Sequence, residues 1–535
     1  MFSSFLLAAL IPLVAAAPGP VTTIRIETQE DFDALGTQIL KALSEQVSRV
    51  EVSFRKGTYY FSEDHINLQE PHAGNTTIVL DGNGSVLLGK GEDYRLRQGR
   101  AAFSGTYLPT DGFYSLGDGK LLSPYSPVRK ARSAVGSAGK GLYRMRVSES
   151  DLRKKECKDT YVVLSEWYRT RRYPVVEIRK GYLYFRSEDP LLEMNWDIRY
   201  GQTFPKYVFV NHPGYGDVSV QGGTVRSSSA RVHRSTASRF IWAWTGELGR
   251  LEVRNFTFAG NGGKDPLIML YCTAMHSSEF SHCRFSGIQH CALSVHRVDN
   301  VSIHDNVFED CFREVVYSDM FARNSEIFAN RFTNSGCAFE GTAVIRTEGG
   351  GMHVHDNYLT DFTYAGILAG VHYTNDQPVI TSGVIERNEL CQSESFRAEP
   401  SRTLMDCGAI YVRTMNTDLV IRDNYIHDYA GTKDYRGIFG DDGASHVTVV
   451  DNVITGIPKG NCIDFRRVPE VLTLPDSHAR EANVHNRIEG NQVDGTVRFE
   501  TRGGQDGCVK GKNPVLKTDA QKQQAEKVWR KAGNK

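Results

Sequence analysis

A short pattern recurs through the central half of the chain and limits what the chain can fold into. It consists of an apolar residue, two variable residues, an Asn, one variable residue and a second apolar residue. The short spacings fit one coil of a parallel β-helix, and the longer ones leave room for loops at one corner. We therefore predict an all-β, right-handed parallel β-helix. The asparagines are Asn306, Asn330, Asn357, Asn388, Asn424, Asn452 and Asn491, spaced by 24, 27, 31, 36, 28 and 39 residues, after a degenerate copy with Cys283 at the Asn position.

The geometry of such a coil explains both parts of the pattern. Alternating apolar residues point into the coil, and parallel strands pair with those of the neighbouring coils at about 4.8 Å. An Asn at each corner tolerates a left-handed backbone and can hydrogen-bond to its counterpart in the next coil. We therefore interpret the Asn row as structural. The regular leucines of leucine-rich repeats are absent, and propeller blades need longer repeats.

The length of the chain agrees with a solenoid. A chain of 535 residues, 40% of them hydrophobic, would ordinarily form roughly two to four domains. Coils that pack only on their neighbours remove that limit. Fifty glycines against eighteen prolines suit many strands joined by tight corners better than a helical bundle.

The first seventeen residues predict export. Met1 to Ala17 is apolar and ends in small residues before Pro18, as a signal peptide does, although no Lys or Arg lies near its start. A membrane anchor is the alternative, but the run is shorter than the roughly 20 residues needed to span a bilayer. We expect a secreted or periplasmic protein with no membrane span.

Net charge and cysteine content limit which partners and which cysteine chemistry the chain can have. The net charge is zero, so no global field selects nucleic acid or another charged polymer. Ten cysteines fit neither a small disulfide scaffold nor a C-x-x-C zinc site, and we favour buried hydrophobes over disulfides for them. Monomer and homo-oligomer both stay open. N-glycosylation sequons begin at Asn75, Asn83, Asn255 and Asn300.

Other segments flank or interrupt the repeat. Gln29 to Ser44 predicts a short helix that closes the first coil. Short strands and a Lys180-Gly181 turn indicate an antiparallel insertion, and Asp519 to Ala532 predicts a polar helix over the far end or on the surface. The predicted parts are a signal peptide at 1–17, a cap with the first coils at 18–99, an inserted β-rich domain at 100–205, the main β-helix at 206–500 and a tail at 501–535.

Stacking one strand from each coil predicts a functional strip. A solvent-facing row of acids, arginines and aromatic residues suits an oligosaccharide, because sugar rings stack on aromatic faces while charged groups hold hydroxyls. The aligned inward residues are Val316, Ile345, Ile367, Ile410, Ile438 and Ile463. The next positions, pointing outward, hold Tyr317, Arg346, Leu368, Tyr411, Phe439 and Asp464, and two residues further stand Asp319, Glu348, Gly370, Arg413, Asp441 and Arg466.

The most specific element of the strip is Gly437-Ile-Phe-Gly-Asp441-Asp442-Gly443, one coil before Asp464. Asp441 and Asp464 are diagonal neighbours, so their Cβ atoms should lie about 7–8 Å apart. Asp441, Asp442 and Asp464 are therefore the candidate catalytic residues of a glycoside hydrolase, with retention and inversion both open.

The remaining polar and aromatic residues of the strip are candidates for substrate binding. Asp406 lies at a strand entrance, and Glu348 precedes three glycines. The alternative is that Asp-Asp-Gly is an ordinary turn and that the acids form ion pairs with neighbouring arginines. The substrate-binding candidates are Asp406, Tyr411, Arg413, Glu348, Arg346, Phe439 and Arg466.

Histidines beside the repeat do not predict a metal site. His304, His353, His355, His427 and His446 lack H-E-x-x-H or a similar ligand spacing. We interpret them as surface residues, and for a hydrolase we expect no metal and no other cofactor.

The chain resembles the β-helix glycoside hydrolases of the pectate-lyase-like superfold, especially glycoside hydrolase families 120 and 141. The likeness extends over most of residues 25–500. The segments that carry it are Lys56-Gly-Thr-Tyr-Tyr-Phe61, Trp167-Tyr-Arg-Thr-Arg171-Arg172-Tyr173-Pro174, Asp406-Cys-Gly-Ala-Ile-Tyr411, Asn424-Tyr-Ile-His427-Asp428 and the Gly437 to Gly443 segment.

The resemblance implies a pectin-lyase-like solenoid with two acidic residues on its surface. By that likeness, Asp441 or Asp442 would be the nucleophile and Asp464 the general acid. The sequence departs from the family pattern at Phe439-Gly440, where a bulkier aliphatic pair often precedes the Asp, and at Cys407, where Gly is usual. At these two positions the resemblance implies neither the exact substrate nor the activity of those families.

Two other functions stay open. A polysaccharide lyase would neutralise a uronate with local positive charge and could bind Ca²⁺ through Asp441 and Asp442. A non-catalytic glycan-binding β-helix would use the same surface without cleavage, because a fold does not imply a function. The arginines available to a lyase are Arg346, Arg413, Arg466 and Arg467.

Overall fold

The structure is a computed structural model. It describes residues 19–69, 75–95, 112–115, 122–123, 129–148, 160–166, 169–188, 206–210, 219–220, 231–244, 248–262, 265–271, 275, 277–288, 290–311, 313–336, 342–370, 381–398, 406–413, 416–430, 435–441, 444–465, 485–499 and 507–532.

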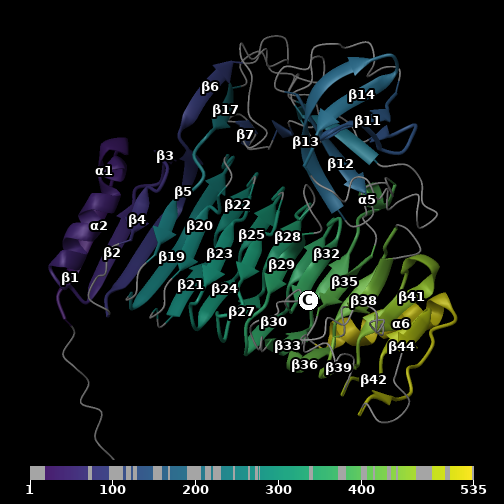
Figure 1. Ribbon diagram of the computed structural model, residues 1–535. Helices are drawn as coiled ribbons and strands as arrows, with labels where there is room; N and C mark the ends of the chain where they lie inside the picture. The colour runs from purple at the N-terminus through teal and green to yellow at the C-terminus, as the bar shows by residue number, and fades with distance from the viewer. Residues whose placement is uncertain are drawn as a thin grey trace, which may run out of the picture.

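Parallel strands stacked coil on coil form the body of the molecule (Figure 1). An 11-stranded sheet, which we call sheet B, receives one strand from each coil. Its strands are β4 (Ile66–Leu68), β18 (Ile241–Ala243), β20 (Ile268–Tyr271), β23 (Leu293–His296), β26 (Val316–Ser318), β29 (Ala343–Thr347), β32 (Ala365–Ala369), β35 (Cys407–Val412), β38 (Tyr435–Gly440), β41 (Asn461–Phe465) and β44 (Thr496–Phe499).

A 22-stranded sheet, which we call sheet A, forms the other walls in two parallel rows joined by the long strands β5 (Thr77–Gly89) and β19 (Arg250–Ala259). The first row holds β1 (Val21–Ile26), β2 (Arg49–Phe54), β21 (Ser277–Ser281), β24 (Val301–His304), β27 (Glu326–Phe328), β30 (Met352–His355), β33 (Thr381–Glu386), β36 (Asn416–Arg422), β39 (Val447–Val450), β42 (Arg487–Glu489) and β45 (Val509–Lys510). The second holds β3 (Thr58–Phe61), β22 (Arg284–Ser286), β25 (Val307–Glu309), β28 (Arg331–Thr333), β31 (Tyr358–Thr360), β34 (Glu389–Cys391), β37 (Tyr425–His427), β40 (Val453–Ile454) and β43 (Gln492–Val493).

The stacked walls make the predicted right-handed parallel β-helix, and its interior is filled by the repeat. The inward residues from Val316 to Ile463 pair coil by coil in the predicted register and are fully buried. Phe258, Phe285, Phe308 and Phe332 stack in one column with ring centroids 4.7 to 4.9 Å apart. Like residues therefore stack on like residues along the solenoid, as expected for a core in which each coil packs only on its neighbours.

The predicted asparagine ladder is confirmed. From Asn306 to Asn491, each Asn side chain donates to the Oδ1 of the next Asn at 2.8 to 3.1 Å. The ladder runs one step further than the repeat predicts, to Asn513. The expected left-handed backbone is wrong for the asparagines themselves, because the preceding residues adopt it, for example Asp305 and Asp356 at φ +54°.

The N-terminal helix forms in two pieces. α1 (Gln29–Asp33) and α2 (Leu35–Ser44) meet at Ala34, and Thr28 caps the first piece with a capping box. The predicted apolar face is buried through Phe32, Leu35, Ile39 and Leu43. Phe32 packs in the hydrophobic cluster that continues into the coils.

Antiparallel strands interrupt the solenoid after β5. β6 (Gly91–Arg95) pairs with β17 (Arg231–Ser235), so the chain leaves and returns on neighbouring strands, and β7 (Gly112–Ser115) extends this sheet. The Lys180-Gly181 turn has positive φ at both residues, as the hairpin requires. The larger inserted sheet holds β9 (Arg129–Lys130), β10 (Gly136–Gly139), β11 (Leu142–Arg146), β12 (Tyr161–Glu166), β13 (Arg169–Arg179), β14 (Tyr182–Arg186) and β15 (Lys206–Val210).

The C-terminal helix α6 (Asp519–Lys531) packs against the outside of the second row of sheet A. Trp529 is buried against Tyr425 and Val453, and its indole Nε1 donates to the Asp423 carbonyl at 2.5 Å. Arg530 forks onto the Glu389 carboxylate at 2.8 and 3.0 Å. Of the two places left open by the sequence, the side of the solenoid is therefore the one that this helix contacts.

Six of the seven cysteines in the described part of the chain are buried. They are Cys283, Cys291, Cys311, Cys391, Cys407 and Cys462, with Cys508 partly exposed. The burial of the first six agrees with the interpretation as small buried hydrophobes. Within the described ranges, no helix is long and apolar enough to cross a membrane. The predicted signal peptide lies outside the described residues.

Candidate active site

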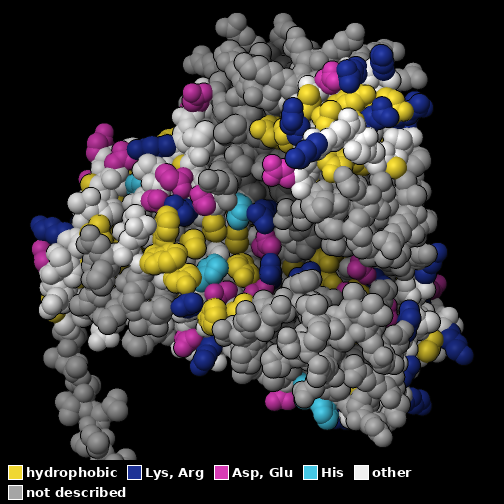
Figure 2. Space-filling view, in the orientation of Figure 1, with side chains coloured by type: hydrophobic (Ala, Val, Ile, Leu, Met, Phe, Trp, Pro, Cys, Tyr) yellow, Lys and Arg dark blue, Asp and Glu magenta, His cyan; other side chains and the backbone are white. Residues whose placement is uncertain are grey.

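The predicted strip forms on the outer face of sheet B. Strand register aligns Tyr317, Arg346, Leu368, Tyr411, Phe439 and Asp464 in one row across six coils. The row begins earlier than predicted, with Asn67, Trp242, Met269 and Ser294, and continues to Arg498. Figure 2 shows hydrophobic side chains gathered beside histidine, basic and acidic side chains on the face that it views.

The expectation that the whole row faces solvent is wrong. Leu368, Tyr411, Phe439 and Asp464 point outward from the sheet, yet at most 4% of each is exposed. Register decides only on which side of the sheet a side chain lies, and packing above the sheet decides whether water reaches it. An aromatic and acidic cluster that excludes water strengthens the electrostatic interactions within it.

Tyr411 and Asp441 form the first part of the cluster. The Tyr411 hydroxyl donates to Asp441 Oδ2 at 2.8 Å, and Asp441 is the residue two positions beyond Phe439 in the next coil. The Arg413 guanidinium lies 5.1 Å from the centre of the Tyr411 ring, and that ring stacks on Phe439 at 5.0 Å. Asp441 is half-buried, so this carboxyl group is the more accessible of the two predicted acids.

Asp464 forms the second part, around a buried arginine. Arg436 is 1% exposed, and its Nε donates to Asp464 Oδ2 at 3.1 Å. Its Nη1 lies 3.6 Å from Asp406 Oδ1, so Arg436 joins two predicted site carboxylates. Arg498 approaches Asp464 Oδ1 from the following coil at 3.8 Å. Asp464 therefore faces two guanidiniums, one from its neighbour on each side in the stack.

Arg436 is the residue that sequence reasoning missed. It shares strand parity with the inward Ile438 and pairs with Gly408, so simple alternation assigns it to the coil interior. Its guanidinium instead lies 4.2 Å from the centre of the Phe439 ring and reaches Asp464. The sequence did contain one sign of its role: a charged residue stands where the alternating pattern places an interior apolar residue.

Glu348 and Arg346 form a separate cluster. Arg346 Nε donates to Glu348 Oε1 at 2.7 Å, and the Tyr317 hydroxyl donates to Glu348 Oε2 at 3.1 Å. Burial, followed by the charge of Glu348, raises the pKa of Tyr317, which keeps its hydroxyl a donor. Three coils separate Glu348 from Asp441, or about 14 Å at about 4.8 Å per coil. These residues therefore do not share one reaction centre.

Three predicted residues of the strip cannot be placed. Asp442, Arg466 and Arg467 lie outside the described residues. Arg413 and Asp441 each contact Tyr411, the first at its ring and the second at its hydroxyl.

Exposed aromatic rings extend the outer face toward the N-terminus. Trp244 is 46% exposed, and its ring stacks on Tyr271 with centroids 4.1 Å apart and planes 10° apart. Trp242 lies 6.3 Å from Trp244, under the Arg239 guanidinium. Trp244 stands seven coils before Asp441 on the same outer face, or about 34 Å away.

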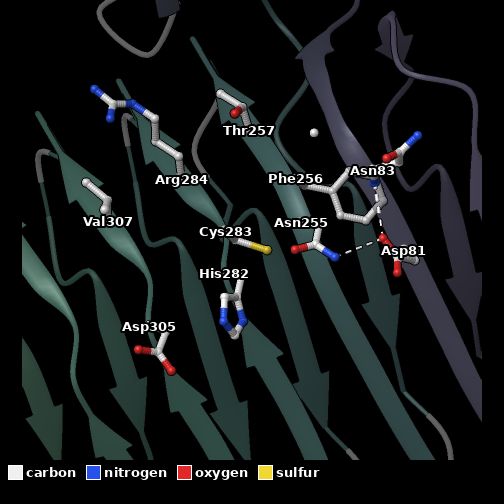
Figure 3. A pocket seen from close by; sticks show the side chains of 11 residues that line it. Asp81, Asn83, Asn255, Phe256, Thr257, His282, Cys283, Arg284, Asp305 and Val307 are labelled. Carbon is white, nitrogen blue, oxygen red and sulfur yellow. Dashed lines mark hydrogen bonds between the residues drawn. The ribbon is translucent and has the colours of Figure 1, made fainter.

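A pocket of about 700 Å³ lies at a corner of sheet A, away from the strip (Figure 3). Its lining includes two carboxylates, and both are already engaged. Asp81 accepts from Asn255 and Arg254 at 3.0 Å each, and Asp305 lies 2.8 Å from the His304 ring. Burial raises the pKa of Asp81, but the hydrogen bonds from Asn255 and its other partners lower it below the ordinary value. The carboxylates of this pocket are therefore held by neighbouring side chains of sheet A.

Comparison with known proteins supports the fold. Residues 268–467 match the family model described as "Right handed beta helix region". The fold is a right-handed parallel β-helix. A solved structure described as a glycoside hydrolase is similar, with a TM-score of 0.57 and 11% identity over 94% of this chain and 98% of that one. At this identity the likeness concerns the fold alone. No curated protein matches the chain by sequence.

Two further structures share less of the geometry. XylC in complex with xylose has a TM-score of 0.35 and 10% identity, over 88% of this chain and 75% of that one. The catalytic unit of a GH87 alpha-1,3-glucanase from Streptomyces thermodiastaticus has a TM-score of 0.25 and 11% identity, over 78% and 98%. Likenesses this distant carry no argument about the site of this β-helix.

Proposed function

We propose that this β-helix is a secreted glycoside hydrolase that cleaves a polysaccharide or oligosaccharide on the outer face of sheet B. The observation that carries the proposal is the pair of acidic residues in unlike surroundings, Asp441 beside a tyrosine hydroxyl and Asp464 beside two guanidiniums. Glycoside hydrolysis needs one carboxyl group that can give a proton and one that stays ionised.

The surroundings of the two acids favour roles opposite to those that the family resemblance implies. Arg436 and Arg498 hold Asp464 as a carboxylate, which suits stabilisation of an oxocarbenium-like transition state. Asp441 is more accessible, and the Tyr411 hydroxyl occupies only its Oδ2. Oδ1 is therefore the atom of Asp441 that we assign to proton transfer toward the leaving group. Asp406 positions Arg436 from the opposite side.

A lyase mechanism has less support from Arg346 and Arg436. Arg436 is paired with Asp464 and Asp406, and Arg346 is paired with Glu348. Guanidiniums engaged by the protein's own carboxylates are poorly placed to neutralise a uronate. The exposed Trp244 and the ring stacked on it favour a chain of sugars as the ligand, because sugar rings pack on aromatic faces.

Product analysis on a panel of neutral and acidic polysaccharides tests the proposal. Saturated products with new reducing ends are expected, and their formation should persist after chelation. Unsaturated products that absorb in the ultraviolet and vanish on chelation would replace the proposal with a lyase. Binding to a glycan that stays intact would replace it with a binding module. Loss of turnover in Asp441→Asn and Asp464→Asn, with Asp305→Asn on sheet A unaffected, would locate the activity.

A further inference from the structure

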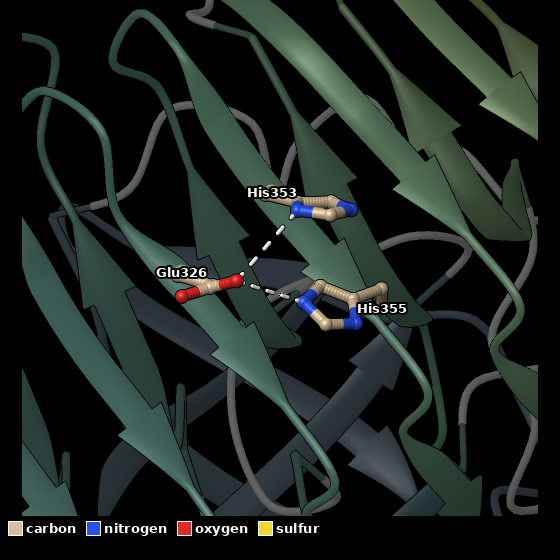
Figure 4. Close-up of side chains that lie close together, drawn as sticks. All are labelled: Glu326, His353 and His355. Atoms are coloured by element: carbon tan, nitrogen blue, oxygen red, sulfur yellow. Dashed lines mark hydrogen bonds and ion pairs between the residues drawn. The ribbon is translucent and has the colours of Figure 1, made fainter.

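Three potential metal ligands converge on the outer face of the first row of sheet A (Figure 4). Glu326 lies in β27, and His353 and His355 lie in β30 of the next coil, with Glu326 in register with His353. Residues two apart in a strand share one face, so both imidazoles point toward the Glu326 carboxylate. One ligand atom from each residue lies within 4.8 Å of the other two.

The distances suit a tetrahedral ion. Glu326 Oε1 lies 3.1 Å from His355 Nε2 and 3.8 Å from His353 Nδ1. Zinc bonds of 2.0–2.2 Å in tetrahedral geometry separate two ligand atoms by about 3.3 Å. The two observed separations lie on either side of that value, so a small side-chain adjustment would complete the site.

The second nitrogen of each ring is held by another carboxylate. His355 Nδ1 lies 2.6 Å from Asp356 Oδ2, and His353 Nε2 lies 3.0 Å from Glu386 Oε1. Histidines that bind metals usually donate their other N–H to a carboxylate in this way, which fixes the ring and the tautomer. Both imidazoles therefore present their remaining nitrogen to Glu326.

The local charge favours a cation. Glu386 accepts from Arg422 at 2.6 Å and forms an ion pair with Arg387. Arg387 also donates to Asp356. The carboxylates of Glu326, Asp356 and Glu386 thus outnumber the guanidiniums of Arg387 and Arg422 around the two imidazoles.

We propose that Glu326, His353 and His355 bind Zn²⁺, with solvent completing the shell. Two imidazoles and one carboxylate suit zinc better than Ca²⁺ or Mg²⁺, which prefer oxygen ligands. The ion would join β27 to β30 and so fasten two successive coils. The site is independent of the carboxylates on sheet B. No metal site was predicted from the sequence, because Glu326 comes from a different coil than His353 and His355.

The chain contains a matched set of residues that lacks one ligand. Glu279 and His304 occupy the places of Glu326 and His355, and Asp305 holds His304 Nδ1 at 2.8 Å, as Asp356 holds His355. Ser302 is in register with Glu279 where His353 is in register with Glu326. This second set provides an internal control, because it keeps the acids and one imidazole without the second imidazole.

To test the proposal, the full-length protein is first stripped of metal with a chelator. Its affinity for Zn²⁺ is then measured by competition with a chromophoric chelator. We expect one Zn²⁺ per chain and a higher thermal midpoint with Zn²⁺. With Co²⁺ instead, a visible d–d absorption band should appear. Glu326→Gln and His353→Ala should remove the Co²⁺ band, and Asp356→Asn should weaken Zn²⁺ binding by about 10–100-fold. His304→Ala should change neither.

Two results would overturn the site. One is a wild-type protein that takes up no Zn²⁺. The other is Zn²⁺ bound equally well by Glu326→Gln and His353→Ala. Glu326→Gln preserves side-chain shape at a carboxylate that is 46% exposed, so this variant keeps the test decisive if His353→Ala fails to fold. Both readouts are independent of glycan cleavage.

Discussion

The Tyr411 hydroxyl donates to Asp441 Oδ2 at 2.8 Å across two neighbouring coils. The same diagonal relationship recurs between Tyr317 and Glu348, at 3.1 Å. In each case a tyrosine in one coil contacts an acid two residues further along the strand of the next coil. Of these two tyrosine–acid pairs, the one with Asp441 lies beside Asp464. Asp441 is one coil before Asp464, which accepts a hydrogen bond from the buried Arg436.

Tyr411→Phe is expected to lower kcat by about 10-fold with little change in KM. The substitution removes the hydrogen bond to Asp441 and keeps the ring that stacks on Phe439. A hydrogen bond contributes about 0.5–1.5 kcal/mol, and about 1.4 kcal/mol is a factor of ten. Steady-state kinetics measures the effect, and an unchanged kcat would show that the hydroxyl has no part in turnover.

Asp441→Asn and Asp464→Asn should differ in how they depend on the leaving group. Loss of a general acid costs about 10²–10⁴-fold on a natural glycoside, and much less on an aryl glycoside whose leaving group needs no proton. Asp441→Asn should show this recovery, while Asp464→Asn should stay slow on both substrates. Recovery in Asp464→Asn alone would instead support the roles implied by the family resemblance.

Trp244→Ala should weaken the use of long substrates only. Trp244 is about 34 Å from Asp441 along the outer face, so only a polymer or long oligosaccharide reaches both. We expect KM to rise for the longest substrates and to stay constant for short ones. Kinetics over a series of chain lengths checks this. Equal effects at every length would show that Trp244 acts on the fold, not on the substrate.

Asn388→Ala should destabilise the solenoid by about 3 kcal/mol. Asn388 Oδ1 accepts from the backbone and side chain of Asn357, and its Nδ2 donates to Asn424 and to Val354. Each buried polar group left unpaired costs about 1–3 kcal/mol. Denaturant unfolding measures the loss.

Asn513→Ala is the comparison for that experiment. Asn513 ends the ladder and is only half-buried, so water can replace part of its bonding and the loss should be smaller. Equal losses at both positions would contradict a ladder in which the interior members contribute most.

The stability of the protein should fall as pH rises above about 6.5. Burial lowers the pKa of His427, but hydrogen bonds with Asp428, Cys391 and Glu389 outweigh it and raise the pKa to about 11. A raised pKa means that the stabilisation is complete below the unfolded value of about 6.5 and declines toward pH 11. Thermal midpoints of wild type and His427→Gln across this range check the sign, and the variant should show a flatter profile.

Glu389 sets the acidic limit of the pH range in which the protein is most stable, as His427 sets the alkaline limit. Burial raises the pKa of Glu389, but hydrogen bonds from His427 and Arg530 lower it to about 2. The stabilisation is therefore complete above the unfolded pKa of about 4.3 and is lost as pH falls toward 2. The contact between α6 and the solenoid should be firmest between these limits. A midpoint that keeps rising above pH 6.5 would contradict this account.

Sequence periodicity predicted the coils because a repeated local pattern places the same residue type at the same place in each turn. The inward row from Val316 to Ile463 and the asparagines obey this rule residue by residue. Where a residue breaks alternation, the rule misplaces it. Alternation assigns Arg436 to the interior, but its guanidinium reaches the outer cluster and holds Asp464.

The sequence by itself determined the stacking, because parallel coils in register need only alternating apolar residues and a corner that can bond to its neighbour. The side of sheet B on which each predicted residue lies followed from the same alternation. Only the tertiary structure decided which outward residues are buried, and which acid contacts a tyrosine or an arginine. It alone brought Glu326 beside His353 and His355. Such contacts join residues from separate coils, and their distances depend on loop lengths and side-chain packing that no local pattern encodes.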